Sequence, residues 1–214
     1  MDEPGMNGDQ ISAPCSEPEI IWENSVDIFV PTVRPLQEFM NEINVRDLDN
    51  EFAPYVFFDS SAYDQMWVDA KMDIMRERGG ILVGDVFADP GGRNYVVVRD
   101  AIAAHNLSAS STHLQFRPES WKPIWDALYS DHSLRIVGWY HTHPRLGVFL
   151  SGTDLRTQRL YFSAPWQIAV VIDPSSMEIG CFFGSNGQKT PFTGRFSRKD
   201  SGPNRGASCA ENEG

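Results

Sequence analysis

One stretch constrains the fold of this chain more than any other: GWYHTHPRLGVFLSGTD, residues 138–154, where two histidines and a proline follow an apolar run. The run, which begins near residue 133, has the length and the branched and aromatic composition of a buried strand. Because side chains alternate between the two faces of a strand, His141 and His143 would project from the same face. Pro144 would end the strand. The stretch therefore predicts a strand that ends in two converging imidazoles.

A helix is predicted after the loop RLGVFL, with Ser151 and Asp154 at its start. The spacing S-x-x-D fits a capping box, and a carboxylate is favoured in the first turn of a helix. Neutral imidazole and carboxylate are also ordinary ligands of Zn²⁺, and catalytic zinc sites combine three such ligands with an open fourth position. The spacing alone leaves two interpretations open: a capped helix beside an ordinary histidine pair, or a metal site formed by His141, His143 and Asp154.

A hydrolytic metal site also needs a general base, for which Glu77 is the candidate. A helix is predicted over residues 60–80, with Ser61 and Asp64 as its N-terminal box and a glycine pair as its stop. Glu77 would then lie in the last turn, where the helix dipole disfavours a carboxylate, so another demand could hold it there. On local grounds alone, an exposed surface glutamate is the simpler interpretation.

Together these residues resemble the signature of the JAMM (JAB1/MPN+) metalloprotease family. That signature is a glutamate upstream of H-x-H-P, six residues and S-x-x-D, which HTHP, RLGVFL and SGTD fill here without a gap. Glu77, Gly80 and Gly84 match the family's E-x-x-G-x-x-x-G. AVVIDP followed by MEIGCFF is similar to the strands that follow the metal helix in this family.

The resemblance implies an MPN/JAB (cytidine-deaminase-like) fold of mixed α and β class, with a central, mostly antiparallel sheet flanked by helices. It also implies one Zn²⁺, held by His141, His143 and Asp154. Glu77 would take a proton from the metal-bound water, which would then attack an isopeptide carbonyl, and Ser151 would help to stabilise the oxyanion. The implied substrate and partner is ubiquitin or a ubiquitin-like protein.

Within the family, HTHPRLGVFLSGTDL is similar to the AMSH-type endosomal deubiquitinases. That subgroup has further His and Cys residues that bind a second, structural zinc, whereas RTQRLYFSAPWQIAV contains neither residue type. The difference favours a bacterial JAB-type isopeptidase with a single zinc. Two other functions stay open: a hydrolase that trims a sulfur-carrier protein or a small amide, and a non-catalytic MPN scaffold subunit. The complete set of motif residues argues against the scaffold.

Four regions are predicted along the chain. Residues 1–18 and 186–214 are rich in Gly, Pro, Ser and charge without an apolar period, which is typical of disordered tails. Residues 19–53 would be an N-terminal extension with a short helix in PLQEFMNEINV, and residues 54–185 would be the metalloprotease domain. Inside that domain, further helices are expected in PESWKPIWDALYS and TDLRTQRLYF, and strands in APYVFFD, ILVGDVF, NYVVVRDAI, HLQFRP, QIAVVID and MEIGCFF.

Composition narrows the cellular setting. A formal net charge of −11 argues against a nucleic-acid partner, because phosphate contacts need clustered Lys and Arg. No stretch approaches the roughly 20 apolar residues of a membrane span, and the acidic N-terminus lacks the features of a secretory signal. The three cysteines have no CxxC spacing, which fits a reducing compartment. We therefore expect a cytoplasmic protein that binds neither nucleic acid nor membranes; the sequence does not indicate its oligomeric state.

Overall fold

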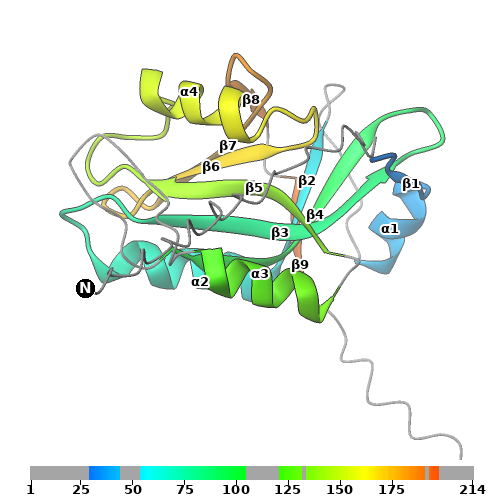
Figure 1. The fold of residues 1–214 in the computed structure, drawn as a ribbon, viewed down its shortest axis with the longest axis horizontal. Helices are drawn as coiled ribbons and strands as arrows, with labels where there is room; N and C mark the ends of the chain where they lie inside the picture. Colours follow the sequence, from blue (N-terminus) through cyan, green and yellow to red (C-terminus); the bar gives the residue numbers. More distant parts are fainter. Residues whose placement is uncertain (1–28, 44–53, 105–120, 132–133, 191–192, 198–214) are drawn as a thin grey trace, which may run out of the picture. The chain divides into compact units, whose positions relative to one another are not determined.

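The computed structural model describes residues 29–43, 54–104, 121–131, 134–190 and 193–197 (Figure 1). Residues Pro31–Gly214 group as one compact unit, and the fold is that of its described part. Its helices are α1 (Leu36–Glu42), α2 (Ser60–Met72), α3 (Trp121–Ser130) and α4 (Gly152–Tyr161). Its strands are β1 (Thr32–Val33), β2 (Tyr55–Asp59), β3 (Gly79–Ala88), β4 (Asn94–Ala103), β5 (Arg135–Thr142), β6 (Ile168–Asp173), β7 (Glu178–Phe183), β8 (Gln188–Thr190) and β9 (Gly194–Phe196).

The strands form one mixed sheet in the order β8-β7-β6-β5-β3-β4-β2-β9, with β1 paired to β3 outside this path. The predicted mixed α/β class is confirmed, and the sheet contains both kinds of strand pairing. Four of the pairings between described strands are parallel and four are antiparallel. The parallel pair β5 and β6 needs a crossover connection, which α4 supplies.

Two neighbouring residues of β5 show how helices cover both faces of the sheet. The Tyr140 hydroxyl donates to Asp69 of α2, whereas the Trp139 indole N–H donates to Gln158 of α4. Successive side chains of a strand point to opposite faces, so α2 and α4 lie on opposite sides of the sheet, as Figure 1 shows. His141 shares the face of Trp139 and therefore lies on the α4 side.

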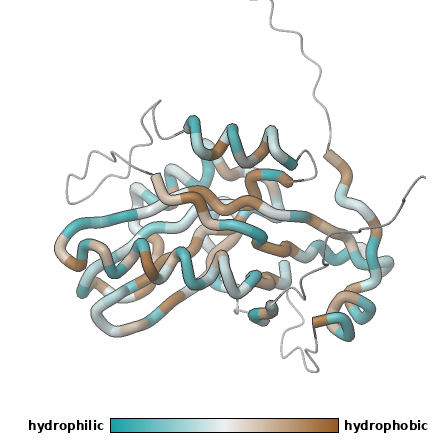
Figure 2. The backbone as a smooth tube through the Cα atoms, turned by 90° about the horizontal axis from the view of Figure 1, so that it is seen from below, coloured by the Kyte–Doolittle hydropathy of each residue, from teal (hydrophilic) through white to brown (hydrophobic). Residues whose placement is uncertain are grey.

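Apolar side chains fill the space between the sheet and its helices. On the α4 side, Ile81, Trp139 and Val171 pack with Phe162 and with Ile124 of α3. Figure 2 shows hydrophobic positions along the strands and hydrophilic ones along much of the helices. This division is the usual consequence of removing apolar surface from water.

The described part of the predicted N-terminal extension belongs to the same sheet. Phe39 of α1 packs edge-on to Phe57 and to Phe196, with ring centroids 5.0 Å and 5.6 Å away. β1 pairs with β3. The described part of this segment therefore contributes side chains to the core of the domain and a strand to its sheet.

The predicted start of the C-terminal tail at residue 186 is wrong. β8 pairs with β7, and β9 pairs with β2, so residues 188–190 and 194–196 extend the two edges of the sheet. The buried Thr190 hydroxyl donates to the carbonyl of Pro54 at 3.1 Å. The predicted strand HLQFRP, the predicted tail at residues 1–18 and the end of the chain from residue 198 lie outside the described residues.

The predicted helix over residues 60–80 is shorter at its C-terminal end. It ends at Met72, because the Asp73 carboxylate accepts the backbone N–H groups of Met75 and Arg76 at 2.8 Å and 3.1 Å in place of a further turn. Its N-cap is Asp59 rather than a box of Ser61 and Asp64. In the described ranges, no helix combines the length and apolar character that crossing a membrane requires.

Candidate metal centre

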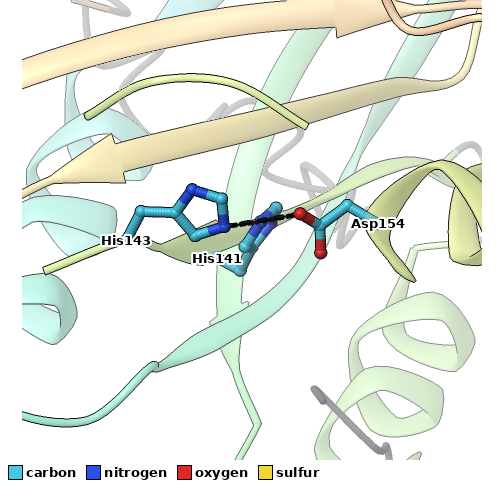
Figure 3. A group of neighbouring side chains, drawn as sticks. All are labelled: His141, His143 and Asp154. Carbon is cyan, nitrogen blue, oxygen red and sulfur yellow. Dashed lines mark hydrogen bonds and ion pairs between the residues drawn. The ribbon is translucent and has the colours of Figure 1, made fainter. Parts of the chain in front are cut away.

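The end of β5 brings two imidazoles together, as the alternation of the strand predicted. The rings of His141 and His143 lie 4.7 Å apart at 73°, and their Nε2 atoms are 3.1 Å apart (Figure 3). Both side chains are buried. The two nitrogen atoms therefore face one small volume on the α4 side of the sheet.

Asp154 completes this cluster from the first turn of α4. Its Oδ2 lies 3.3 Å from Nε2 of His141 and 3.4 Å from Nε2 of His143. Ser151 is the N-cap: its backbone N–H donates to Asp154 Oδ2 at 2.7 Å, and its Oγ accepts the N–H of Asp154 at 3.3 Å. The capping box thus aims the carboxylate at the imidazoles, so a capped helix is compatible with a metal site formed by the same residues.

The three ligand atoms have a spacing that suits a tetrahedral metal ion. Zinc bonds to nitrogen and oxygen of about 2.0–2.2 Å correspond to ligand–ligand distances of roughly 3.3–3.5 Å in a tetrahedron. The separations of 3.1, 3.3 and 3.4 Å are close to this range. In the described part of the chain, His141, His143 and Asp154 are the one group of potential ligands that converges in this way. The residues therefore fit Zn²⁺.

The environment sets the charge of each ligand. Burial lowers the pKa of His141, although Asp154 opposes this shift, so the imidazole is neutral near pH 7 and has a free lone pair. Burial would raise the pKa of Asp154, but hydrogen bonds from His141, His143 and Ser151 outweigh it and hold this pKa well below its usual range. A neutral imidazole at His141 and an anionic carboxylate at Asp154 are suitable donors for a dication.

Ring packing holds the imidazoles in place. Trp139 stacks on His141, and Phe149 lies 4.8 Å from His143. Both Nδ1 atoms are buried and have no hydrogen-bond partner among the described residues. Within this part of the chain, aromatic neighbours and the contacts of both Nε2 atoms with Asp154 therefore orient the two rings.

Gln158 is a supporting residue that the sequence analysis missed. It is fully buried on α4, accepts the Trp139 indole N–H at 2.8 Å and donates to the carbonyls of Phe162 and Gln167, both at 3.0 Å. It follows Asp154 by four residues, so both point from the same face of α4. The four-residue spacing was visible in the sequence and could have indicated that Gln158 lies on the same face of the helix as Asp154. In the structure, this face of α4 contacts β5.

Asp173 was also missed. Its carboxylate accepts the backbone N–H groups of Arg145 at 3.1 Å and Gly147 at 3.0 Å in the loop that follows His143. Arg145 and Gly147 have φ values of 65° and 83°, a region in which residues other than glycine are strained. The buried carboxylate therefore fixes an unusual loop between the histidines and Asp154.

Glu77 does not lie at a helix end, so the dipole argument for it was wrong. It lies, half-buried, in the segment that joins α2 to β3. Gly79 and His141 form the terminal pair between β3 and β5, and the same register, continued by two residues beyond β3, would set Glu77 opposite His143. Residues directly opposite each other in an antiparallel pair share a face. A register continued in this way would direct Glu77 to the side of the sheet that carries His141 and His143.

Comparison with known proteins points to one family. Residues 65–164 match the sequence model of the family described as JAB1/Mov34/MPN/PAD-1 ubiquitin protease. COP9 signalosome complex subunit 5 from Caenorhabditis elegans is 28% identical over 198 residues, which are 83% of this chain and 51% of that protein. COP9 signalosome complex subunit 5a from Arabidopsis thaliana is 31% identical over 148 residues, which are 63% of this chain and 39% of that protein. The chain spans about half the length of these relatives or less.

Solved structures agree on the fold. The solution structure of a protein from Desulfitobacterium hafniense matches 68% of this chain and 94% of its own, with a TM-score of 0.50 and 18% sequence identity. At a sequence identity this low, structural similarity supports a shared fold and not a shared function. Together with the family match, it confirms the predicted JAB/MPN architecture. The finer resemblance to AMSH-type enzymes stays a prediction.

Proposed function

Residues 65–164 match the JAB/MPN family, and we propose that the chain is a zinc-dependent isopeptidase or peptidase of this family that deconjugates or processes ubiquitin or a ubiquitin-like protein. The observation that carries this proposal is the buried cluster of His141, His143 and Asp154, whose three ligand atoms lie 3.1–3.4 Å apart. A charged cluster of this kind is costly to bury unless it binds a cation or is fully paired.

His141, His143 and Asp154 would hold the zinc, which when bound supplies a Lewis acid that polarises a carbonyl and acidifies water. Glu77 would accept the proton that is released, since the β3–β5 register, if continued beyond Gly79, would bring it opposite His143. Ser151 would stabilise the developing oxyanion. Its Oγ accepts the Asp154 N–H at 3.3 Å, which leaves the hydroxyl proton available for donation.

The surface beside this cluster is suited to a protein substrate. Leu146 and Phe149, in the loop between the histidines and α4, are 60% and 44% exposed. Exposed apolar side chains next to a reactive centre are a common means of holding an extended peptide. The description of the matching family as a ubiquitin protease supports ubiquitin-like proteins as the substrate class.

Zinc content and hydrolysis, measured on the same samples, test this function. We expect one zinc per chain, cleavage of an amide bond at the C-terminus of a ubiquitin-like protein, and loss of both in His141→Ala. His105→Ala, which changes a histidine outside the motif, is the control and should keep both. Glu77→Gln should keep the zinc and lose hydrolysis by roughly 10²–10⁴-fold, the usual effect of a positioned base.

Two outcomes would contradict the proposal. A chain without zinc after gentle purification and zinc addition would refute the metal centre. A chain that binds zinc at these ligands but cleaves no ubiquitin-like amide would support the non-catalytic scaffold. Near-normal turnover of Glu77→Gln with normal zinc content would refute the role of Glu77 alone.

A further inference from the structure

A second polar network lies on the far side of β5 from the candidate metal centre. At its middle is Asp69 of α2, whose side chain is only 6% exposed. One carboxylate oxygen accepts hydrogen bonds from the Arg78 guanidinium, from Nε at 2.9 Å and from Nη2 in a shorter contact. The other oxygen accepts the Tyr140 hydroxyl at 3.0 Å. One buried carboxylate therefore ties α2 to β5 and to the segment that enters β3.

Each partner of Asp69 is adjacent in sequence to a residue of the candidate site. Tyr140 precedes His141, and Arg78 follows Glu77. Consecutive side chains on extended backbone point to opposite faces. When Asp69 holds the Arg78 side chain toward α2, the backbone turns Glu77 toward the face that carries His141.

Backbone contacts hold the segment around Arg78 against the end of β5. The N–H of Arg78 donates to Oγ1 of Thr142 at 2.9 Å, and the N–H of Thr142 donates to the carbonyl of Arg78 at 2.8 Å. Thr142 is the residue between the two histidines. The segment that contains Glu77 is thus fastened to β5 within one residue of each candidate imidazole.

Before Arg78, the Asp73 carboxylate accepts the backbone N–H groups of Met75 and Arg76, and the side chains there are largely exposed. Ile74 and Met75 are 45% and 72% exposed. By contrast, α2 is anchored by buried Met66 and Ala70, which makes it a firm base for the contact from Asp69. Two donors of one planar guanidinium on the same carboxylate oxygen also fix the orientation of the Arg78 side chain.

We propose that Asp69 acts through Arg78 and Tyr140 as a positioning residue that sets Glu77 opposite His143. This inference rests on the proposed function, because it assigns to the network the placement of the general base. A displacement of about 1 Å at a reacting group can cost on the order of 10² in rate. The network therefore affects the rate of proton transfer and leaves the metal ligands on β5 and α4 unchanged.

Matched substitutions on the two sides of Glu77 test the positioning. Arg78→Gln should lower kcat for a ubiquitin-like fusion by about 10- to 100-fold, with KM and zinc content unchanged. Arg76→Gln removes the same charge from an exposed position immediately before Glu77 and should leave kcat unchanged. Because Arg78→Gln leaves the Asp69 carboxylate without its ion-pair partner, the neutral pair D69N/R78Q serves as a second variant that should show the same loss of kcat. Equal turnover in the wild-type, Arg78→Gln and D69N/R78Q proteins would overturn the inference.

A double-substitution cycle separates positioning from general damage. If Arg78 acts through Glu77, Arg78→Gln should cause no further loss of turnover in a Glu77→Gln background. The same fold-loss in both backgrounds would refute the inference while leaving the proposed function intact. A Glu77→Gln protein with full turnover would instead refute the assigned base.

Hydrogen exchange on the metal-free protein gives a readout that is independent of activity. In Arg78→Gln, exchange at the Thr142 amide should accelerate by at least tenfold, because its acceptor is the Arg78 carbonyl. Exchange at amides in the middle of β5 should stay unchanged. Wild-type protection of the Thr142 amide in Arg78→Gln would show that the side chain does not hold this segment and would overturn the inference.

Discussion

The indole of Trp139 lies parallel to the imidazole of His141, with ring centroids 4.5 Å apart and an interplanar angle of 9°. Because Gln158 accepts the indole N–H, a residue of α4 sets the orientation of this stack, and α4 also carries Asp154. Two ligands from different elements are thus linked by one hydrogen bond. The geometry of the cluster of His141, His143 and Asp154 depends on this link as well as on the contacts within the cluster.

Gln158→Leu should therefore weaken both the fold and the metal site. It leaves the buried Trp139 N–H and two backbone carbonyls without their partner, at a cost of roughly 1–3 kcal/mol for each unsatisfied group. Zinc affinity should fall by about 10- to 100-fold, the usual effect of losing an outer-shell partner. Urea unfolding and zinc competition measure the two effects. Gln37→Leu, on the exposed side of α1, is the control and should change neither.

Replacement of Ser151 should separate its two roles. Ser151→Ala removes the N-cap hydroxyl, so the free energy of unfolding should fall by about 1 kcal/mol. Loss of one oxyanion donor should lower kcat by about 10²–10³-fold. Ser151→Thr keeps a hydroxyl and should recover most of both properties. A variant Ser151→Ala with full turnover and reduced stability would restrict this residue to capping.

Local patterns were sufficient to predict that His141, His143 and Asp154 form a cluster. Alternation placed His141 and His143 on one face, and the cap signal placed Asp154 in the first turn of a helix. Both depend only on residues near in sequence, which is why the strand and the helix were found. The JAB/MPN fold followed from the family resemblance that these residues carry.

Features that depend on distant contacts were not predictable in this way. β8 and β9 have three residues each, too few for a recognisable period, and they are held by pairing with β7 and β2. The surroundings of Glu77 depend on the register between β3 and β5 and on a helix that ends early at Asp73. Asp173 and Gln158 act on backbone and side chains that only the folded chain brings near them.

The stability of the metal-free chain should depend on pH in two ranges. The folded state lowers the pKa of buried His141, so the unfolded chain takes up a proton more readily and stability is lost as pH falls through about 6.5. The folded state also lowers the pKa of Asp154, through its imidazole and serine contacts against the effect of burial, and that of Asp173, through backbone N–H groups against the same effect. Their contribution is present above pH 4 and is lost as pH falls below it.

Urea unfolding of the metal-free protein from pH 8 to pH 3 measures this dependence. The free energy of unfolding should be level above pH 7, should decline below about 6.5 and should fall more steeply below about 4. His141→Asn should flatten the first decline, and Asp173→Asn should reduce the second. Stability that rises between pH 7 and pH 5 would contradict the assigned direction for His141.

The corrected C-terminal boundary predicts where the chain can be shortened. A chain that ends at residue 197 keeps β8 and β9 and should retain wild-type stability and hydrolysis. A chain that ends at residue 187 loses Thr190 and Phe196, which are 2% and 7% exposed, and uncovers Phe39 and the edge of β2. Removal of a buried Phe side chain alone costs about 3–5 kcal/mol, so this shorter chain should unfold at much lower urea concentration.

Phe196→Ala in the full-length chain identifies the cause of that loss. If β9 stabilises the sheet through Phe196, this single substitution should reproduce most of the destabilisation of the shorter chain. Arg195→Ala changes the neighbouring residue, whose guanidinium is paired with exposed Asp64, and should cost at most about 1 kcal/mol. If the chains that end at residues 187 and 197 are equally stable, the segment after residue 186 does not stabilise the fold, as first predicted for a tail.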